Sequence, residues 1–171
     1  MCSATVFQLI NTSPYINTGT NAETFPIQIN GLTGSSTTNT LTIEPATTAS
    51  ISATSTGTAV DELIVLNGAS NIIITGLSGT NLTLSTAYNG DIPVYITGAC
   101  TNDQISYCNV EAYSTGTSAD PDIYIYSNHG ATSTVSVTNC NIHDNTSVGY
   151  TSYGIYVGNS KCVIAATNNN I

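Results

Sequence analysis

The chain has almost no positive charge, because Lys161 is the only lysine or arginine among its 171 residues. Ten acidic residues face this single cation, and the net charge is −9 at neutral pH. Binding to nucleic acid or to an anionic membrane surface requires clustered cations that pair with phosphates. The composition therefore argues against both classes of partner.

Long apolar runs are also missing. No segment approaches the roughly 20 apolar residues that a membrane-spanning helix needs, so we expect no membrane insertion. The opening residues, MCSATVFQLI, lack the basic and apolar regions of a signal peptide. The charge-poor composition, rich in threonine and asparagine, is nevertheless typical of an extracellular or cell-surface protein. We expect its export signal to lie outside this sequence.

Helical periodicity is absent too, since no stretch keeps an apolar period of 3.6 residues beyond about two turns. Threonine, serine, asparagine and glycine replace the missing charges, and this mixture favours strands and turns. We therefore expect an all-β protein with little or no helix. Five cysteines are an odd number and too few for a closed disulfide framework, so the apolar core must stabilise the fold.

What the sequence does contain is a short alternating run that returns after about thirty residues. The first inward-facing candidate in each run is separated from the next by 37, 30, 29 and 32 residues, as read from their numbers. Such recurrence indicates a repeat architecture. The runs are PIQING (26–31), LIVLNG (63–68), PVYITG (93–98), DIYIYSN (122–128) and GIYVGNS (154–160).

A second run follows each of these after a turn, and then comes a variable loop or a third short strand such as NLTLS (81–85). Strands this short cannot bury a face alone, whereas stacking of like strands encloses a shared interior. We predict a single-stranded parallel β-helix of about five coils over residues 1–171, with residues 1–24 as an N-terminal cap or a first partial coil. The second runs begin at residues 40, 71, 103, 133 and 162.

Alternation within the strands sorts the side chains into inward and outward columns. The main rival, a β-sandwich, requires hairpin signals every 8 to 12 residues, which the sequence does not show. The predicted inward residues are Ile27 and Ile29, Ile64 and Leu66, Val94 and Ile96, Ile123 and Ile125, and Ile155 and Val157. The predicted outward residues are Gln28, Val65, Tyr95, Tyr124 and Tyr156.

Several segments resemble rungs of the right-handed parallel β-helix of the pectin-lyase-like superfamily, namely NIIITGL, TNCNIHDN and GIYVGNSKCVIAATNNNI. The segments INTGTNAETFPIQIN, TLTIEPATTASISA and ELIVLNGASNIIITGL resemble β-helix regions of large secreted surface proteins of Bacteroidetes-like bacteria. The resemblance covers nearly the whole chain and implies a right-handed coil, a secreted protein and contact with polysaccharide. It does not imply catalysis.

The superfamily's enzymes cleave acidic polysaccharides with a basic residue, usually beside Ca²⁺, or hydrolyse glycans with clustered aspartates. Lys161 alone cannot supply the cations of a lyase, so an enzyme here would be a glycoside hydrolase. Hydrolysis needs two carboxylates about 5 to 10 Å apart, and Asp91, Asp120 and Asp122 precede neighbouring strands. The alternative is that these acids only hydrogen-bond to turn amides. A Ca²⁺ site there is weakly signalled and no cofactor is expected.

Histidine and cysteine offer little further chemistry. His143 and Asp144 are adjacent on a strand and face opposite ways, and neither His143 nor His129 has a partner at metal-ligand spacing. Cys108 and Cys140 are one coil apart, so we expect them to stack in the core as reduced thiols, with a disulfide as the alternative.

The clearest surface feature is a predicted column of tyrosines, formed by Tyr95, Tyr124 and Tyr156 with Tyr126 beside it. A ladder that only stabilises the fold is one interpretation; a surface that stacks on sugar rings or docks a partner is the other. We expect a non-catalytic structural or adhesive segment that binds polysaccharide or copies of itself end to end into a fibre. The alternative is a polysaccharide-binding module or a glycan-active enzyme.

Overall fold

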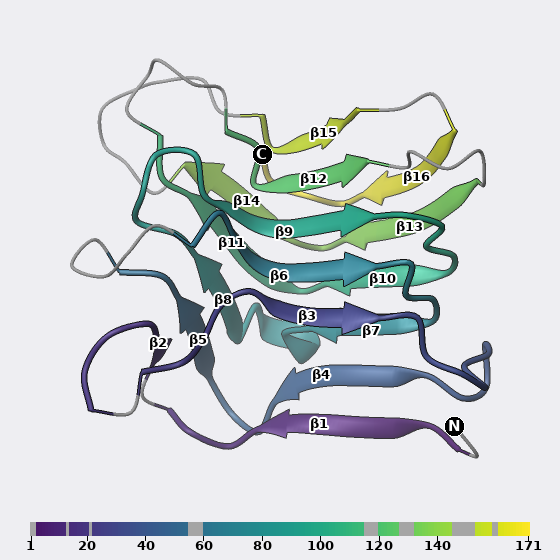
Figure 1. Cartoon of the computed structure of the whole chain (residues 1–171), viewed down its shortest axis with the longest axis horizontal. Helices are drawn as coiled ribbons and strands as arrows, with labels where there is room; N and C mark the ends of the chain where they lie inside the picture. The colour runs from purple at the N-terminus through teal and green to yellow at the C-terminus, as the bar shows by residue number, and fades with distance from the viewer. Residues whose placement is uncertain are drawn as a thin grey trace.

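The chain forms three parallel β-sheets that wrap around one interior (Figure 1). The computed structural model describes residues 3–12, 14–20, 22–54, 60–114, 120–126, 132–144, 153–158 and 161–171. Within these residues it has sixteen strands and one short 3₁₀ helix, η1 (Leu77–Gly79). The strands follow one another as five triplets, from β1–β3 to β13–β15, and then β16.

Each triplet gives one strand to each sheet, in the order A, B, C. Sheet A contains β1 (Thr5–Leu9), β4 (Leu41–Pro45), β7 (Ile72–Thr75), β10 (Asp103–Ser106), β13 (Ser133–Thr138) and β16 (Cys162–Thr167). Sheet B contains β2 (Tyr15–Ile16), β5 (Ala49–Ser52), β8 (Leu82–Ser85), β11 (Cys108–Ala112) and β14 (Asn141–Asp144). Sheet C contains β3 (Ile27–Asn30), β6 (Glu62–Asn67), β9 (Ile92–Thr97), β12 (Ile123–Tyr126) and β15 (Ile155–Val157).

The chain winds as a right-handed coil. In Figure 1 the strands of sheet C run to the right in front, and those of sheet A return to the left behind them, while the chain rises from its N-terminus. Every ladder between neighbouring strands is parallel. The predicted parallel β-helix is therefore confirmed, and the β-sandwich alternative is wrong.

The predicted inward column of sheet C is present in register. Ile27 pairs with Ile64, Ile64 with Val94, Val94 with Ile123, and Ile123 with Ile155. Burying an aliphatic side chain of this size contributes about 1.5–3 kcal/mol, so a column of them is a large part of the folding free energy. Sheets A and B add parallel columns, which are Ile43, Ile74, Ile105 and Val137 in sheet A and Ile51, Leu84, Val110 and Ile142 in sheet B.

Val65 departs from the expectation of an exposed outward residue. It lies on the outer face in register between Gln28 and Tyr95, but it is only 7% exposed. Its larger neighbours in the ladder stand about 4.8 Å away on either side, and this spacing leaves little of a valine side chain in contact with water.

Sheet B is only partly evident from the sequence. The third short strand predicted at NLTLS (81–85) is present as β8, but other strands of this sheet were hidden inside longer runs. The runs that begin at residues 103 and 133 each look like one strand. In the structure each is two strands that meet at a sharp corner, at Tyr107 and at Asn139. Both corner residues have a left-handed backbone, with φ of 54° and 55°. A single left-handed residue turns the chain without the glycine or proline that normally marks a turn.

The interior is open at the ends of the coil. β1 and β2 belong to the first triplet, so residues 5–9 and 15–16, within the predicted cap or first partial coil, are strands of the coil. Phe7 is in register with buried Ile43 but is 61% exposed, and Val157 in the last strand of sheet C is 39% exposed. Beside Phe7 lies an apolar cavity of about 160 Å³, lined also by Ile27 and Ile43.

Candidate functional site

The most distinctive outer surface is a strip of stacked tyrosines on sheet C. Tyr95, Tyr124 and Tyr156 are in register on β9, β12 and β15. Their ring centroids are 5.2 Å and 5.3 Å apart, with interplanar angles of 34° and 48°. The separations follow from the spacing of parallel strands, about 4.8 Å. The structure thus brings together the three tyrosines that the sequence places in one column.

Two further rings complete what we call the tyrosine strip, defined as Tyr95, Tyr124, Tyr126, Tyr153 and Tyr156. The Tyr126 ring lies 6.0 Å from that of Tyr124, as the sequence led us to expect of a neighbour. Tyr153 was not predicted, and its ring lies 5.3 Å from that of Tyr156. It precedes β15 and follows no strand alternation, so its only sequence signal is its closeness to Tyr156.

The strip is packed tightly against the backbone at Gly158. A Cβ atom built on Gly158 would lie 2.8 Å from Cδ2 of Tyr126 and 2.9 Å from the hydroxyl of Tyr124. Partial burial raises the pKa of Tyr124, and the neighbouring phenols of Tyr95 and Tyr156 raise it further. The strip is open to solvent at its C-terminal end, because Tyr153 is 52% exposed and Tyr156 41%.

Neutral polar side chains continue this outer face of sheet C across β6 to β3, the first strand of the sheet. Asn30, Asn67, Thr97 and Tyr126 are in register. The side-chain amide of Asn67 donates a hydrogen bond to Oδ1 of Asn30 at 3.2 Å, and Gln28 donates to the same oxygen at 2.8 Å. The outer face of sheet C therefore combines aromatic rings with amide and hydroxyl groups, and none of these named side chains carries a charge at neutral pH.

The three candidate acids lie at the corner before sheet C and are buried. The exposed fractions of Asp91, Asp120 and Asp122 are 1%, 8% and 1%. Each carboxylate accepts hydrogen bonds from the backbone. Asp91 binds the N–H groups of Val60 and Asp61, both at 3.2 Å; Asp120 binds that of Gly90 at 2.8 Å; and Asp122 binds that of Ala112 at 2.6 Å. These are the turn-amide contacts of the alternative interpretation, and none of the three acids lines the cavity beside Phe7.

Burial raises the pKa of two of these acids, Asp91 and Asp122, and of Asp103 nearby in the chain. It raises the pKa of Asp122 to about 8, against the opposing hydrogen bond from Ala112, and the nearby charge of Asp144 adds to the rise. Burial also raises the pKa of Asp91. Asp103, at the start of β10, has a pKa of about 7 for the same reason, although it accepts a hydrogen bond from the N–H of Ile72 at 2.9 Å. These carboxyls retain protons at pH values where surface carboxyls have lost them.

The predicted cysteine stack is present. Cys108 and Cys140 begin the corner segments of neighbouring turns, are 0% and 2% exposed, and are free thiols. A hydrogen bond with Cys140 and burial together raise the pKa of Cys108 well above its usual range. Cys100 and Cys162 are also free, while Cys2 lies outside the described residues.

His143 forms a contact that the sequence did not suggest. It is paired in register with Glu111, and its Nε2 lies 3.6 Å from a carboxylate oxygen of Glu111 and 3.2 Å from Oδ1 of Asn109. His129 lies outside the described residues. Within the described part of the chain, no group of three or more His, Cys, Asp or Glu side chains is arranged to hold a metal ion.

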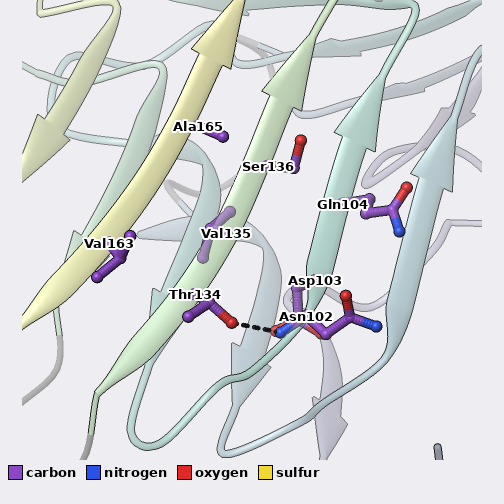
Figure 2. Close-up of a pocket in the computed structure, with 8 residues that line it drawn as sticks. All are labelled: Asn102, Asp103, Gln104, Thr134, Val135, Ser136, Val163 and Ala165. Atoms are coloured by element: carbon purple, nitrogen blue, oxygen red, sulfur yellow. Dashed lines mark hydrogen bonds between the residues drawn. The ribbon is translucent and has the colours of Figure 1, made fainter. Parts of the chain in front are cut away.

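A shallow groove crosses the outer face of sheet A (Figure 2). Its volume is about 340 Å³, and small Ser136 and Ala165, which are in register, form its floor. Gln104 is in register with Ser136 on the next strand, and at one end the Thr134 hydroxyl accepts a hydrogen bond from the N–H of Asn102 at 2.7 Å. The sequence signal for this groove is the small side chains at outward positions. They indicate a hollow in the surface, but they do not indicate a ligand or a reaction.

The described residues contain no helix that is both long and apolar enough to cross a membrane.

A scan against protein-family models finds no match for the chain, and searches of curated proteins and of solved structures find none either.

Proposed function

We propose that this protein is a non-catalytic extracellular scaffold whose sheet C face adheres to neutral polysaccharide. The observation that carries the proposal is the tyrosine strip, in which three rings stand 5.2 Å and 5.3 Å apart along the sheet C ladder and two further rings adjoin them. Rings held by a sheet lose little conformational freedom when a ligand stacks on them. The amides of Asn67, on the strand next to β9, and of Asn30, one strand further along sheet C, supply donors and acceptors for sugar hydroxyls.

Charge favours a neutral ligand over an acidic one. The net charge of −9 repels an acidic polysaccharide at long range. The only lysine or arginine, Lys161, cannot neutralise a chain of carboxylates. The resemblance of the rungs to the pectin-lyase-like superfamily supports a polysaccharide ligand and a secreted protein, while the charge points away from that superfamily's acidic substrates.

Affinity electrophoresis tests this proposal, with a neutral β-glucan or mannan in the gel and polygalacturonate as the acidic comparison. We expect a neutral polymer to retard the protein. Tyr156→Ala should weaken binding by about 1 kcal/mol, or roughly fivefold in affinity. Tyr107→Ala is the matched control, because Tyr107 is also exposed, at 36%, but lies outside the strip. Equal losses in both variants, or no retardation by any neutral polymer, would contradict the proposal.

A glycoside hydrolase is the alternative from another functional class. It predicts new reducing ends when the protein is incubated with the same polysaccharides, and their loss in Asp91→Asn, Asp120→Asn or Asp122→Asn. The buried, backbone-bonded state of these carboxyls supports a structural role instead. If the wild type produced reducing ends and the three variants did not, the non-catalytic assignment would be overturned.

A second proposal is that copies of the chain stack end to end. β1 and β16 are the edge strands of sheet A at opposite ends, and they have five and six residues. A second copy placed with its β1 against β16 continues the sheet in the same direction, and its open interior meets the exposed end of the first copy. Exposed strand edges are ready templates for such pairing.

Sedimentation velocity over a range of protein concentrations tests the stacking. We expect larger species at higher concentration and their loss in Phe7→Glu, which places a charge in the open interior. Val6→Glu is the control, since Val6 is 55% exposed on the neighbouring outward position of β1. A wild type that sediments only as a monomer removes this proposal and leaves polysaccharide adhesion untouched.

A further inference from the structure

We propose that the tyrosine strip is a site of oxidative cross-linking, at which a peroxidase-class oxidant joins Tyr124 to Tyr95 or to Tyr156 through a carbon–carbon bond. The inference does not rest on polysaccharide binding. It follows from the distances, the tilts and the exposure of rings that the parallel ladder holds side by side.

Proximity is the first requirement for coupling two phenols. The Tyr124 ring centroid lies 5.2 Å from that of Tyr95 and 5.3 Å from that of Tyr156. Because the rings are tilted by 34° and 48° rather than parallel, one edge of each ring approaches its neighbour more closely than the centroids do. The strands on which they stand are in register, so the ladder holds the neighbouring phenols side by side.

Access of the oxidant is the second requirement. Tyr153 and Tyr156 are about half exposed at the C-terminal end of the strip. Their rings are 5.3 Å apart, and Tyr156 in turn contacts Tyr124. A phenoxyl radical formed at the exposed end can therefore exchange with the more buried phenols of the strip, whereas a radical on Tyr107 has no ring partner among the described residues.

The coupling reaction balances with hydrogen peroxide as the oxidant. Each of two phenols loses one electron and its hydroxyl proton, and a haem peroxidase passes the two electrons to peroxide, which takes up two protons and leaves as two waters. The two phenoxyl radicals form one bond between ring carbons ortho to oxygen. Each of these carbons then releases its hydrogen as a proton, and each phenol oxygen regains one. The protein loses two hydrogen atoms in total.

The experiment treats the whole protein with a haem peroxidase and peroxide at several dilutions and then digests it with a protease that cleaves after aspartate and glutamate. Asp91, Asp103, Asp122 and Asp144 place the three in-register tyrosines in three different peptides. Mass spectrometry should find a pair of these peptides joined with loss of two hydrogens, accompanied by dityrosine fluorescence. The yield should not fall on dilution, because the coupling is intramolecular.

Two variants decide the assignment. Tyr124→Phe keeps a ring in the strip but removes the hydroxyl from which the radical forms, so we expect both linked peptide pairs to disappear. Tyr107→Phe should leave them unchanged. The proposal is overturned if the linked pairs persist in Tyr124→Phe, if wild-type links involve Tyr107 as often as the strip, if they vanish on dilution, or if no link forms while free tyrosine in the same reaction couples.

Discussion

Tyr107 and Asn139 occupy the same corner of neighbouring turns, and the N–H of Tyr107 donates to the carbonyl of Thr138, the residue before Asn139, at 3.1 Å. Both residues have a left-handed backbone, and Asn168 continues the row one turn later with φ of 57°. Asparagine adopts this conformation readily, whereas most other side chains lose roughly 1–2 kcal/mol in it. The corner is therefore built for asparagine, and Tyr107 is strained there.

We predict that Tyr107→Asn stabilises the protein by about 1 kcal/mol, because it relieves the left-handed strain at the corner. Urea-induced unfolding followed by circular dichroism measures the change. The reciprocal variant Asn139→Tyr should lose a similar amount, since it introduces the same strain one turn later. A loss of stability in both variants would show that packing of the Tyr107 ring outweighs its backbone strain.

Among the glycines that the structure describes, Gly76 leaves the least room for a side chain. A Cβ atom there would lie 1.9 Å from the carbonyl oxygen of Tyr107, which belongs to the rigid backbone of the next turn. Gly76→Ala must push two turns apart, and we expect a loss of about 3 kcal/mol in the free energy of unfolding. Gly79→Ala is the matched control, because its nearest atoms belong to the side chain of Asn81 at 3.3 Å. Similar losses in both variants would contradict this account.

The buried acids predict that stability falls as pH rises. The pKa of Asp122 is about 8 in the folded protein against an ordinary value of 3.8. Between about pH 4 and pH 8 the unfolded chain has released this proton and the folded chain retains it, so each rise in pH favours unfolding. Asp103, with a pKa of about 7, acts in the same direction up to about pH 7.

Thermal unfolding across this pH range measures the effect. In Asp122→Asn the slope of stability against pH should become shallower, while the amide oxygen still accepts the hydrogen bond from Ala112. Glu23→Gln, at an exposed acid, should leave the slope unchanged. A wild type whose stability rises from pH 4 to pH 8 would show that Asp122 is ionised in the folded state.

The thiols should react in an order set by burial. Cys162 is only half-buried, whereas Cys100, Cys108 and Cys140 are 0 to 2% exposed. Burial also raises the pKa of Cys100 to about 12, which leaves very little thiolate to attack a reagent. In a Cys2→Ser background, maleimide should label Cys162 in the native protein and the other three only after unfolding. Labelling of Cys108 or Cys140 at the rate of Cys162 would show that the core opens locally.

The sequence predicted the ladders well because sheet register tolerates no error. A slip of one residue would move Ile123 and Ile125 out of the core and Tyr124 into it, so alternation together with a thirty-residue recurrence leaves one way to stack the strands. The same logic placed Tyr95, Tyr124 and Tyr156 in one column and Cys140 above its neighbour Cys108. Each of these predictions depends on local pattern repeated at a constant interval.

The corners followed no such pattern. The strands β11 and β14 of sheet B stayed hidden inside longer runs, because the single left-handed residues Tyr107 and Asn139 turn the chain there without glycine or proline. Buried Asp122 accepts its hydrogen bond from Ala112, ten residues away, and the place of Tyr153 depends on how the chain enters β15. The sequence by itself determined a parallel coil, its inward columns and its row of tyrosines, since alternation and periodicity act along the chain. Only the tertiary structure decided how the coil turns its corners, which acidic side chains are buried and which rings join the strip. These features depend on contacts between turns rather than on local pattern.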